Sequence, residues 1–217
     1  AARFAADLAV LDRDLAAGAR NGTPTGRRAH QLIEPLIGAY QQLGQTTEAS
    51  ALHERLFAAA PTPATYDALR AAAKRASPAV QWQQVRQRAL GLLHQLARAG
   101  GPGAAETLVT VLLAEGEVAE AWEAIRRHGC SASLRLAVAE RYAETSPANG
   151  IDVYRPMIDE AIAECNHQGY ARAAALLGTL QGLYARTGND FDRELATLKR
   201  VHHRKRNFIA ELNRHGL

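Results

Sequence analysis

The chain has 217 residues, of which 47% are hydrophobic, 6% are aromatic and 22% are charged, and its formal net charge is +4. A hydrophobic fraction of this size can form a sizeable core, and it excludes the composition of an intrinsically disordered chain. The hydrophobic residues are mostly alanine and leucine, which favours closely packed helices over a β-sandwich built from aromatic and β-branched residues.

The sequence carries neither a signal-peptide pattern at its start nor an apolar run close to the roughly 20 residues that cross a bilayer. We therefore expect a cytoplasmic protein without a membrane partner. Because the chain begins at Ala1 and its single methionine is Met157, we interpret it as part of a longer protein.

Apolar residues recur along the chain with the spacing of amphipathic helices. A clear early stripe, with members three, four, seven and ten positions after the first, is Ile33, Leu36, Ile37, Tyr40 and Leu43. Gly44 ends this helix, because glycine tolerates the left-handed conformation of a helix exit, and Pro61 ends the next. The same criteria predict an all-α protein with helices at 2–18, 26–43, 47–60, 63–76, 79–98, 104–114, 117–127, 131–145, 149–165, 168–186 and 190–214.

A sequence echo recurs every 72 residues, at Gly44, Gly116 and Gly188. A leucine lies eight residues before each glycine, and a large apolar residue lies four residues before it. These positions are Leu36, Leu108 and Leu180, and Tyr40, Leu112 and Tyr184. Half of 72 is 36, which is close to the length of one helix-turn-helix unit of an α-solenoid. The echo therefore predicts stacked helical hairpins, with the leucines buried between helices.

Serine and proline mark two further helix starts, and a glycine cluster marks a joint. Ser77-Pro78 and Ser146-Pro147 place a capping serine before a proline that fits the first helical turn. The cluster at 100–103 contains three glycines and a proline, and we interpret it as a bend, because the 72-residue spacing continues across it. We therefore predict a single helical-repeat domain over 1–217.

The spacing of Tyr40, Gly44, Ala49 and Pro61 resembles the second half of a tetratricopeptide repeat, and Gly116 and Ala121 repeat the glycine-alanine step. The resemblance is degenerate, since Arg193 takes the alanine position of the third unit. It implies a right-handed α-solenoid of about 11–12 helices whose surface binds a protein or peptide partner.

The last 45 residues or so resemble the carboxy-terminal end of bacterial SWIM zinc-finger family proteins. The matching positions are Tyr184 to Gly188, Phe191, Leu195, Leu198 and His202 to Phe208. In that family a zinc motif with three cysteines and a histidine precedes a long helical region. This sequence lacks that motif, so the resemblance implies the helical region of a bacterial protein, and no zinc function is carried over.

The positive charge is concentrated at the end of the chain. Residues 193–217 contain seven lysines and arginines against two glutamates. The candidate surface residues are Lys199, Arg200, His203, Arg204 and Arg206. Three interpretations stay open: a solvated helix end, a surface for an acidic protein partner, and a surface that contacts nucleic-acid phosphates. Phe191 and Phe208 have the helical phase of core residues, so a base-stacking platform is not indicated.

No residue pattern in the sequence firmly indicates a catalytic or a metal-binding site. Glu164, Cys165 and His167 could supply a thiol and a base, but the same residues fit a simple helix end, and a cysteine-histidine dyad is assembled in space and not in sequence. Cys130 is distant from Cys165 and has no metal-ligand spacing. We expect no catalytic residues, no cofactor and no stoichiometric zinc.

The leading hypothesis is a non-catalytic protein-interaction scaffold with an unidentified protein or peptide partner. The alternative is a nucleic-acid-associated module that acts through the basic carboxy-terminal helix. The apolar start at Phe4, Leu8 and Leu11 also leaves room for self-association, because a terminal repeat without its neighbour exposes an apolar face.

Overall fold

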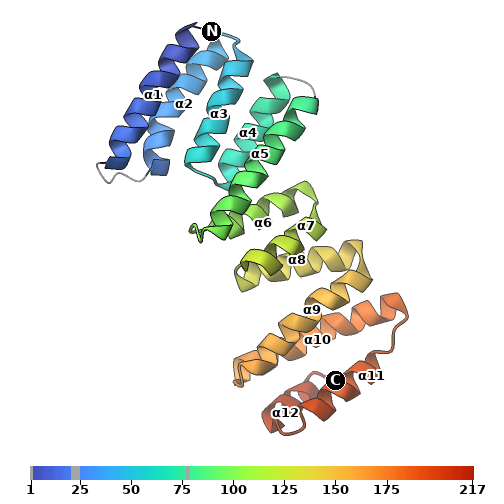
Figure 1. Ribbon diagram of the computed structural model, residues 1–217. Helices are drawn as coiled ribbons and strands as arrows, with labels where there is room; N and C mark the ends of the chain where they lie inside the picture. Colours follow the sequence, from blue (N-terminus) through green and yellow to red (C-terminus); the bar gives the residue numbers. More distant parts are fainter. Residues whose placement is uncertain (1, 21–24, 77–78) are drawn as a thin grey trace. The chain divides into compact units, whose positions relative to one another are not determined.

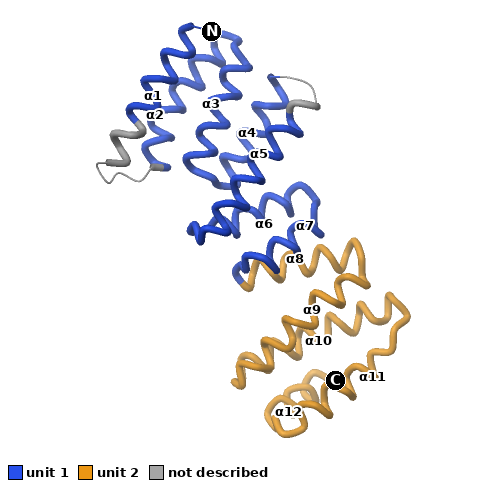
Figure 2. The backbone as a smooth tube through the Cα atoms, viewed as in Figure 1, with its two compact units in different colours: residues 1–131 blue, residues 132–217 orange. Residues whose placement is uncertain are grey.

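The computed structural model describes residues 2–20, 25–76 and 79–217 (Figure 1). Over these ranges the chain forms twelve helices and no strand, which confirms the predicted all-α class. The helices fall into two compact units, residues 1–131 and residues 132–217 (Figure 2). The division follows Ser131, whereas the glycine cluster at 100–103 lies inside the first unit. Among the helices of the described ranges, none combines the length and the apolarity that crossing a membrane requires.

The first unit is built from helices that pack on their neighbours in the sequence (Figure 1). They are α1 (Ala2–Arg20), α2 (Thr25–Gln42), α3 (Thr46–Ala59), α4 (Pro63–Ala76), α5 (Ala79–Arg98), α6 (Ala104–Glu115) and α7 (Val118–His128). Contacts also join α3 to α5 and α4 to α6. Both α3 and α4 therefore pack on the next helix and on the one after it.

The second unit contains five helices, of which α10 contacts three others. They are α8 (Ala132–Thr145), α9 (Pro147–Ala163), α10 (His167–Thr187), α11 (Phe191–Val201) and α12 (Arg206–Arg214). The helices α9, α11 and α12 all pack on α10, and α8 packs on α9. The core of this unit therefore lies around α10.

The three echo glycines each follow a helix and have a left-handed backbone. Their φ angles are +69° at Gly44, +83° at Gly116 and +69° at Gly188. Of the associated residues, those that are buried are Tyr40, Ala49, Leu108, Leu112, Ala121, Leu180 and Tyr184. Leu36 is only partly buried, on the edge of the cluster that contains Ile33 and Leu52. The apolar start of the chain is also partly covered, because Phe4 and Leu8 pack against the same cluster.

The prediction of one helix over 190–214 is wrong. The chain leaves helical geometry at His202, where φ is −102° and ψ is 19°, and a turn over 202–205 separates α11 from α12. The reversal lets Phe208 become fully buried beside the ring of Tyr170, with centroids 5.6 Å apart. The Lys205 ammonium also donates to the carbonyl of Ile162 at 2.9 Å, near the end of α9. These tertiary contacts favour the break over the local helical preference of this segment.

The two predicted serine caps have different outcomes. Ser77-Pro78 lies outside the described residues. Ser146 occupies the N-cap position of α9 and Pro147 is the first helical residue, as the sequence predicts, but the serine side chain makes no capping hydrogen bond. The caps of α10 and α11 do use side chains, since Asn166 accepts from the amide of Gly169 and Asp190 accepts from the amide of Arg193.

Three aromatic rings pack in a row in the first unit, and the middle one contacts a buried carboxylate. Phe57 and Tyr66 lie 5.8 Å apart between centroids, as do Tyr66 and Trp82. The Tyr66 hydroxyl donates to Glu115 at 2.9 Å, and the Arg86 Nε donates to the other oxygen of the same carboxylate at 2.6 Å. The side chain of Glu115 is almost fully buried, so its charge depends on these two partners.

Gly150 and Gly169 allow the close packing of the second unit, and Gly169 gives a sharp prediction. A Cβ on Gly169 would lie 2.5 Å from the carbonyl oxygen of Ala161, which is a backbone atom that cannot rotate away. We expect Gly169→Ala to lower the free energy of unfolding by about 1–3 kcal/mol, because the overpacking outweighs the helical preference of alanine.

The control for this variant lies in the same helix. A Cβ on Gly182 would meet no atom within 4 Å, so Gly182→Ala is expected to stabilise the protein by roughly 0.5–1 kcal/mol. Urea denaturation measures both effects. Equal stabilisation by the two alanines would contradict the close approach of α9 and α10 at Gly169.

Candidate functional site

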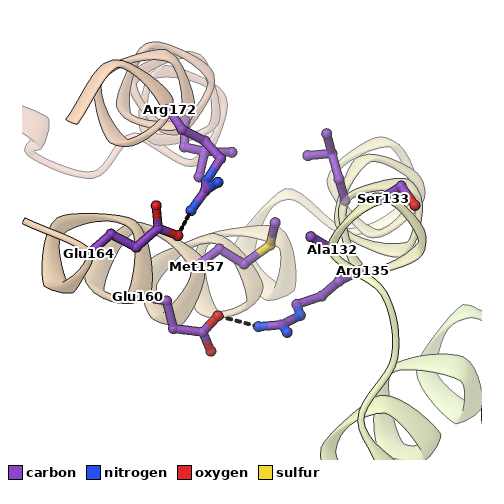
Figure 3. A pocket seen from close by; sticks show the side chains of 9 residues that line it. Ala132, Ser133, Arg135, Met157, Glu160, Glu164 and Arg172 are labelled. Atoms are coloured by element: carbon purple, nitrogen blue, oxygen red, sulfur yellow. Dashed lines mark hydrogen bonds and ion pairs between the residues drawn. The ribbon is translucent and has the colours of Figure 1, made fainter. Parts of the chain in front are cut away.

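Three helices of the second unit surround a cavity of about 430 Å³ (Figure 3). The cavity is called the α8–α10 groove below. Its lining residues are Ala132, Ser133, Arg135, Leu136, Met157, Glu160, Glu164, Arg172 and Leu176. The volume is within the range of about 300–1,000 Å³ that is usual for pockets that bind small ligands.

Helical spacing brings these side chains together. Met157 and Glu160 are three positions apart on α9, and Glu164, the C-cap of that helix, is seven positions after Met157, so the three lie on one face. Arg172 and Leu176 are one turn apart on α10. Leu136 and Met157 are partly exposed, and Leu176 is buried. The groove therefore has an apolar interior made by one residue from each helix.

Two ion pairs lie on either side of Met157 (Figure 3). Arg135 of α8 binds Glu160, and Arg172 of α10 binds Glu164. Each pair leaves little net charge at the edge of the groove. The Nε of Arg135 is buried without a hydrogen-bond partner among the described residues.

This groove is not predicted from the sequence, in which Met157 stands out only as the single methionine and Glu164 only as a neighbour of Cys165. The spacing of Met157, Glu160 and Glu164 could be read from the sequence, but their partners on α8 and α10 could not, because the pairing of helices is a tertiary property.

The predicted basic surface is divided by the turn over 202–205. Lys199 and Arg200 end α11, His203 and Arg204 lie in the turn, and Arg206 begins α12. Lys199 is partly buried and the other four are exposed. Burial and the nearby Lys205 charge lower the pKa of the neighbouring His202, so this imidazole is neutral at pH 7. The five residues thus stay close in sequence but do not form one face of a single helix.

The aromatic residues beside this surface belong to the core, as predicted from their helical phase. Phe208 is fully buried, and Phe191 is buried against the ring of Tyr184 at 5.7 Å. Neither ring can stack on a base without unfolding its surroundings.

Glu164, Cys165 and His167 each contact a different residue. Glu164 binds Arg172, and the His167 Nδ1 lies 3.8 Å from the buried carboxylate of Glu211. The Cys165 sulfur accepts from the Lys205 ammonium at 3.4 Å. The hypothesis of a cysteine-histidine pair with an acidic neighbour is not supported by these contacts. Within the described ranges, no three side chains of the metal-ligating types converge to hold an ion.

Comparisons with family models, with curated proteins and with solved structures found no match to this chain. Its function is therefore inferred from its own residues and their geometry.

Proposed function

We propose that the chain is a non-catalytic protein-interaction scaffold, the helical-repeat region of a larger bacterial protein, and that the α8–α10 groove holds a peptide segment of the partner. In this proposal the hairpins are degenerate tetratricopeptide-like repeats of a right-handed α-solenoid, and the end of the chain corresponds to the helical region of SWIM zinc-finger family proteins. The observation that carries the proposal is the apolar groove bordered by two neutralised ion pairs.

The chemistry of the groove favours a peptide over a nucleic acid. Both arginines at its edge already have carboxylate partners, so they offer little attraction to phosphate. An apolar side chain can displace water from Leu136, Met157 and Leu176. Methionine is flexible and polarizable, which suits a site that adapts to the shape of an inserted side chain. The ligand is therefore a peptide with one apolar anchor flanked by polar or charged residues.

Selection of displayed peptides against the whole chain tests this proposal. We expect selected peptides to share an apolar anchor, and Met157→Gln to weaken their binding roughly tenfold, because an amide of similar shape would be buried without partners. Ala175→Gln is the matched control, since Ala175 is exposed on α10 and does not line the groove. Equal affinity of the wild type and Met157→Gln for every selected peptide would contradict the proposal.

The alternative function is a nucleic-acid-associated module. It rests on the exposure of Arg200, His203, Arg204 and Arg206 around one turn. Guanidinium groups that are free to reach solvent can contact phosphates and release counterions. With Phe191 and Phe208 buried, such binding would depend on charge and not on base identity.

If the basic surface binds nucleic acid, the joint replacement of Arg200, Arg204 and Arg206 by glutamine should weaken binding to all sequences alike. The salt dependence should also flatten, by up to about 0.9 in log–log slope for each lost contact with a duplex phosphate. Titration of short DNA and RNA duplexes at several salt concentrations measures both. The control removes the same charge elsewhere, by glutamine at the exposed Arg13, Arg126 and Arg141. Failure to bind DNA or RNA even at low salt would remove this alternative.

A further inference from the structure

A second cavity, of about 370 Å³, lies within the first unit and has a different chemistry. Its lining residues are Gly91, His94, Arg98, Arg127 and His128, and it is called the histidine–arginine pocket below. Positions 91, 94 and 98 lie three and seven residues apart, so α5 presents them on one face, while Arg127 and His128 end α7. Every titratable side chain that lines this pocket is basic.

The two histidines contact each other. The His94 Nδ1 lies 3.3 Å from the His128 Nε2, and the rings are 5.6 Å apart between centroids. One nitrogen of such a pair must donate and the other accept, so the contact requires at least one neutral ring. Burial lowers the pKa of His94, and the charges of His128, Arg127 and Arg98 lower it further, while Glu120 opposes them. At neutral pH this ring is therefore uncharged.

The two arginines keep their charge at all physiological pH values. The Arg98 Nε–H donates to the backbone carbonyl of His94 at 3.3 Å. This bond holds the guanidinium close to the two histidines. Arg127 and Arg126 lie 3.4 Å and 3.3 Å from the carboxylate of Glu123. One negative charge is therefore shared between two positive charges. The local balance of permanent charges favours an anion.

We propose that the histidine–arginine pocket binds the phosphate group of a small molecule. Arg98 and Arg127 provide charge-assisted donors for the phosphate oxygens, and His94 and His128 provide ring N–H groups. The volume of the cavity leaves room for more than one phosphate group. A phosphate between the two rings also replaces the contact between the imidazoles with two hydrogen bonds, one from each ring to a phosphate oxygen.

A divalent metal ion is the competing ligand, because two imidazole nitrogens 3.3 Å apart could share one ion. Two considerations favour the anion. The arginines place two positive charges beside the metal position, and no third ligand of a suitable type joins the histidines in the described part of the chain.

Phosphate binding in this pocket is linked to protonation. A bound anion favours the protonated form of the His94 imidazole, so binding takes up a proton when that ring is neutral in the free pocket. Affinity should therefore increase as the pH falls below about 6.5, the usual histidine pKa, because the pKa of His94 in the free pocket is lower than this value. Sulfate is a suitable probe of this effect, because it does not itself titrate in that range.

Isothermal titration of the full chain with inorganic pyrophosphate and with sulfate tests the proposal. We expect Arg127→Gln and His128→Gln to weaken pyrophosphate binding roughly tenfold each. Arg126→Gln is the matched control for Arg127→Gln: it removes the neighbouring arginine, which is equally exposed and shares the same glutamate but does not line the pocket. Its effect should be less than twofold. For sulfate, the binding heat in buffers of different ionisation enthalpy should reveal proton uptake at pH 6.5.

Further controls separate this site from the basic surface and from a metal site. The variant with glutamine at Arg200, Arg204 and Arg206 should bind pyrophosphate as the wild type does, whatever the outcome for nucleic acid or peptides. Thermal unfolding of each variant confirms that it is folded. Equal weakening by Arg126→Gln and Arg127→Gln, absence of pyrophosphate binding at millimolar concentration, or stoichiometric binding of Zn²⁺ that His128→Gln abolishes would overturn the proposal.

Discussion

Replacing Leu108 or Leu180 by alanine is expected to lower the free energy of unfolding by about 2–5 kcal/mol. Leu108 is 0% exposed in the first unit and Leu180 is 1% exposed in the second, so each truncation removes packed methyl groups and leaves a cavity. The third echo leucine should behave differently. Leu36 lies at the edge of its cluster, and its truncation is expected to cost less than that of Leu108.

The matched control for these truncations is Leu43→Ala, because Leu43 is 61% exposed at the end of the early apolar stripe. Its effect should stay within about 0.5 kcal/mol. Denaturant titration followed by circular dichroism gives all four values. Unchanged unfolding midpoints for Leu108→Ala and Leu180→Ala would contradict the packing described here.

Removing the carboxylate of Glu115 is expected to destabilise the first unit by about 3–5 kcal/mol, the usual cost of breaking a buried ion pair at one partner. Glu115→Ala leaves the largely buried Arg86 with only its longer contacts to Glu117 and Glu120, at 3.8 and 3.9 Å. It also removes the acceptor of the buried Tyr66 hydroxyl. Glu115→Gln should cost less, because the amide oxygen can still accept from the Tyr66 hydroxyl.

The same network predicts a dependence on alkaline pH. Burial raises the pKa of the Tyr66 hydroxyl above its usual range, and the hydrogen bond and charge of Glu115 raise it further. A raised pKa means that the folded state favours the neutral hydroxyl, so this contribution is complete below the unfolded pKa of about 10 and is lost as the pH rises above it. Tyr66→Phe keeps the aromatic row and should remove this part of the alkaline loss. An unchanged pH profile in Tyr66→Phe, or a Glu115→Ala variant as stable as the wild type, would contradict the network.

Local pattern predicted much of the helical structure, because apolar periodicity and helix-ending glycines are properties of short segments. Gly116 shows this well: it ends α6 with φ of +83°, in the conformation that its position in the echo requires. The break between α11 and α12 was not predicted, since residues 190–214 have no proline or glycine before Gly216 to signal it. It depends on Phe208 and Lys205 reaching α10 and the end of α9, which are contacts between segments about 40 residues apart.

The candidate sites were harder to predict from the sequence than the helices. The basic surface could be found because its charges lie close together in the chain. The α8–α10 groove and the histidine–arginine pocket could not, because each joins residues from different helices. His94 and His128 are 34 positions apart, and nothing in their local sequence indicates that their rings meet.

The single methionine allows a direct test of the proposed scaffold function, because a ¹³C-methyl methionine label reports on Met157 inside the α8–α10 groove. The Met157→Gln variant assigns the signal. On titration with a selected peptide, we expect the Met157 methyl resonance to shift and saturate with the same dissociation constant as the binding measured in solution, while short duplex DNA leaves it unchanged. A peptide that binds the chain while the Met157 resonance stays at its free position would contradict the assignment of this groove as the site of partner binding.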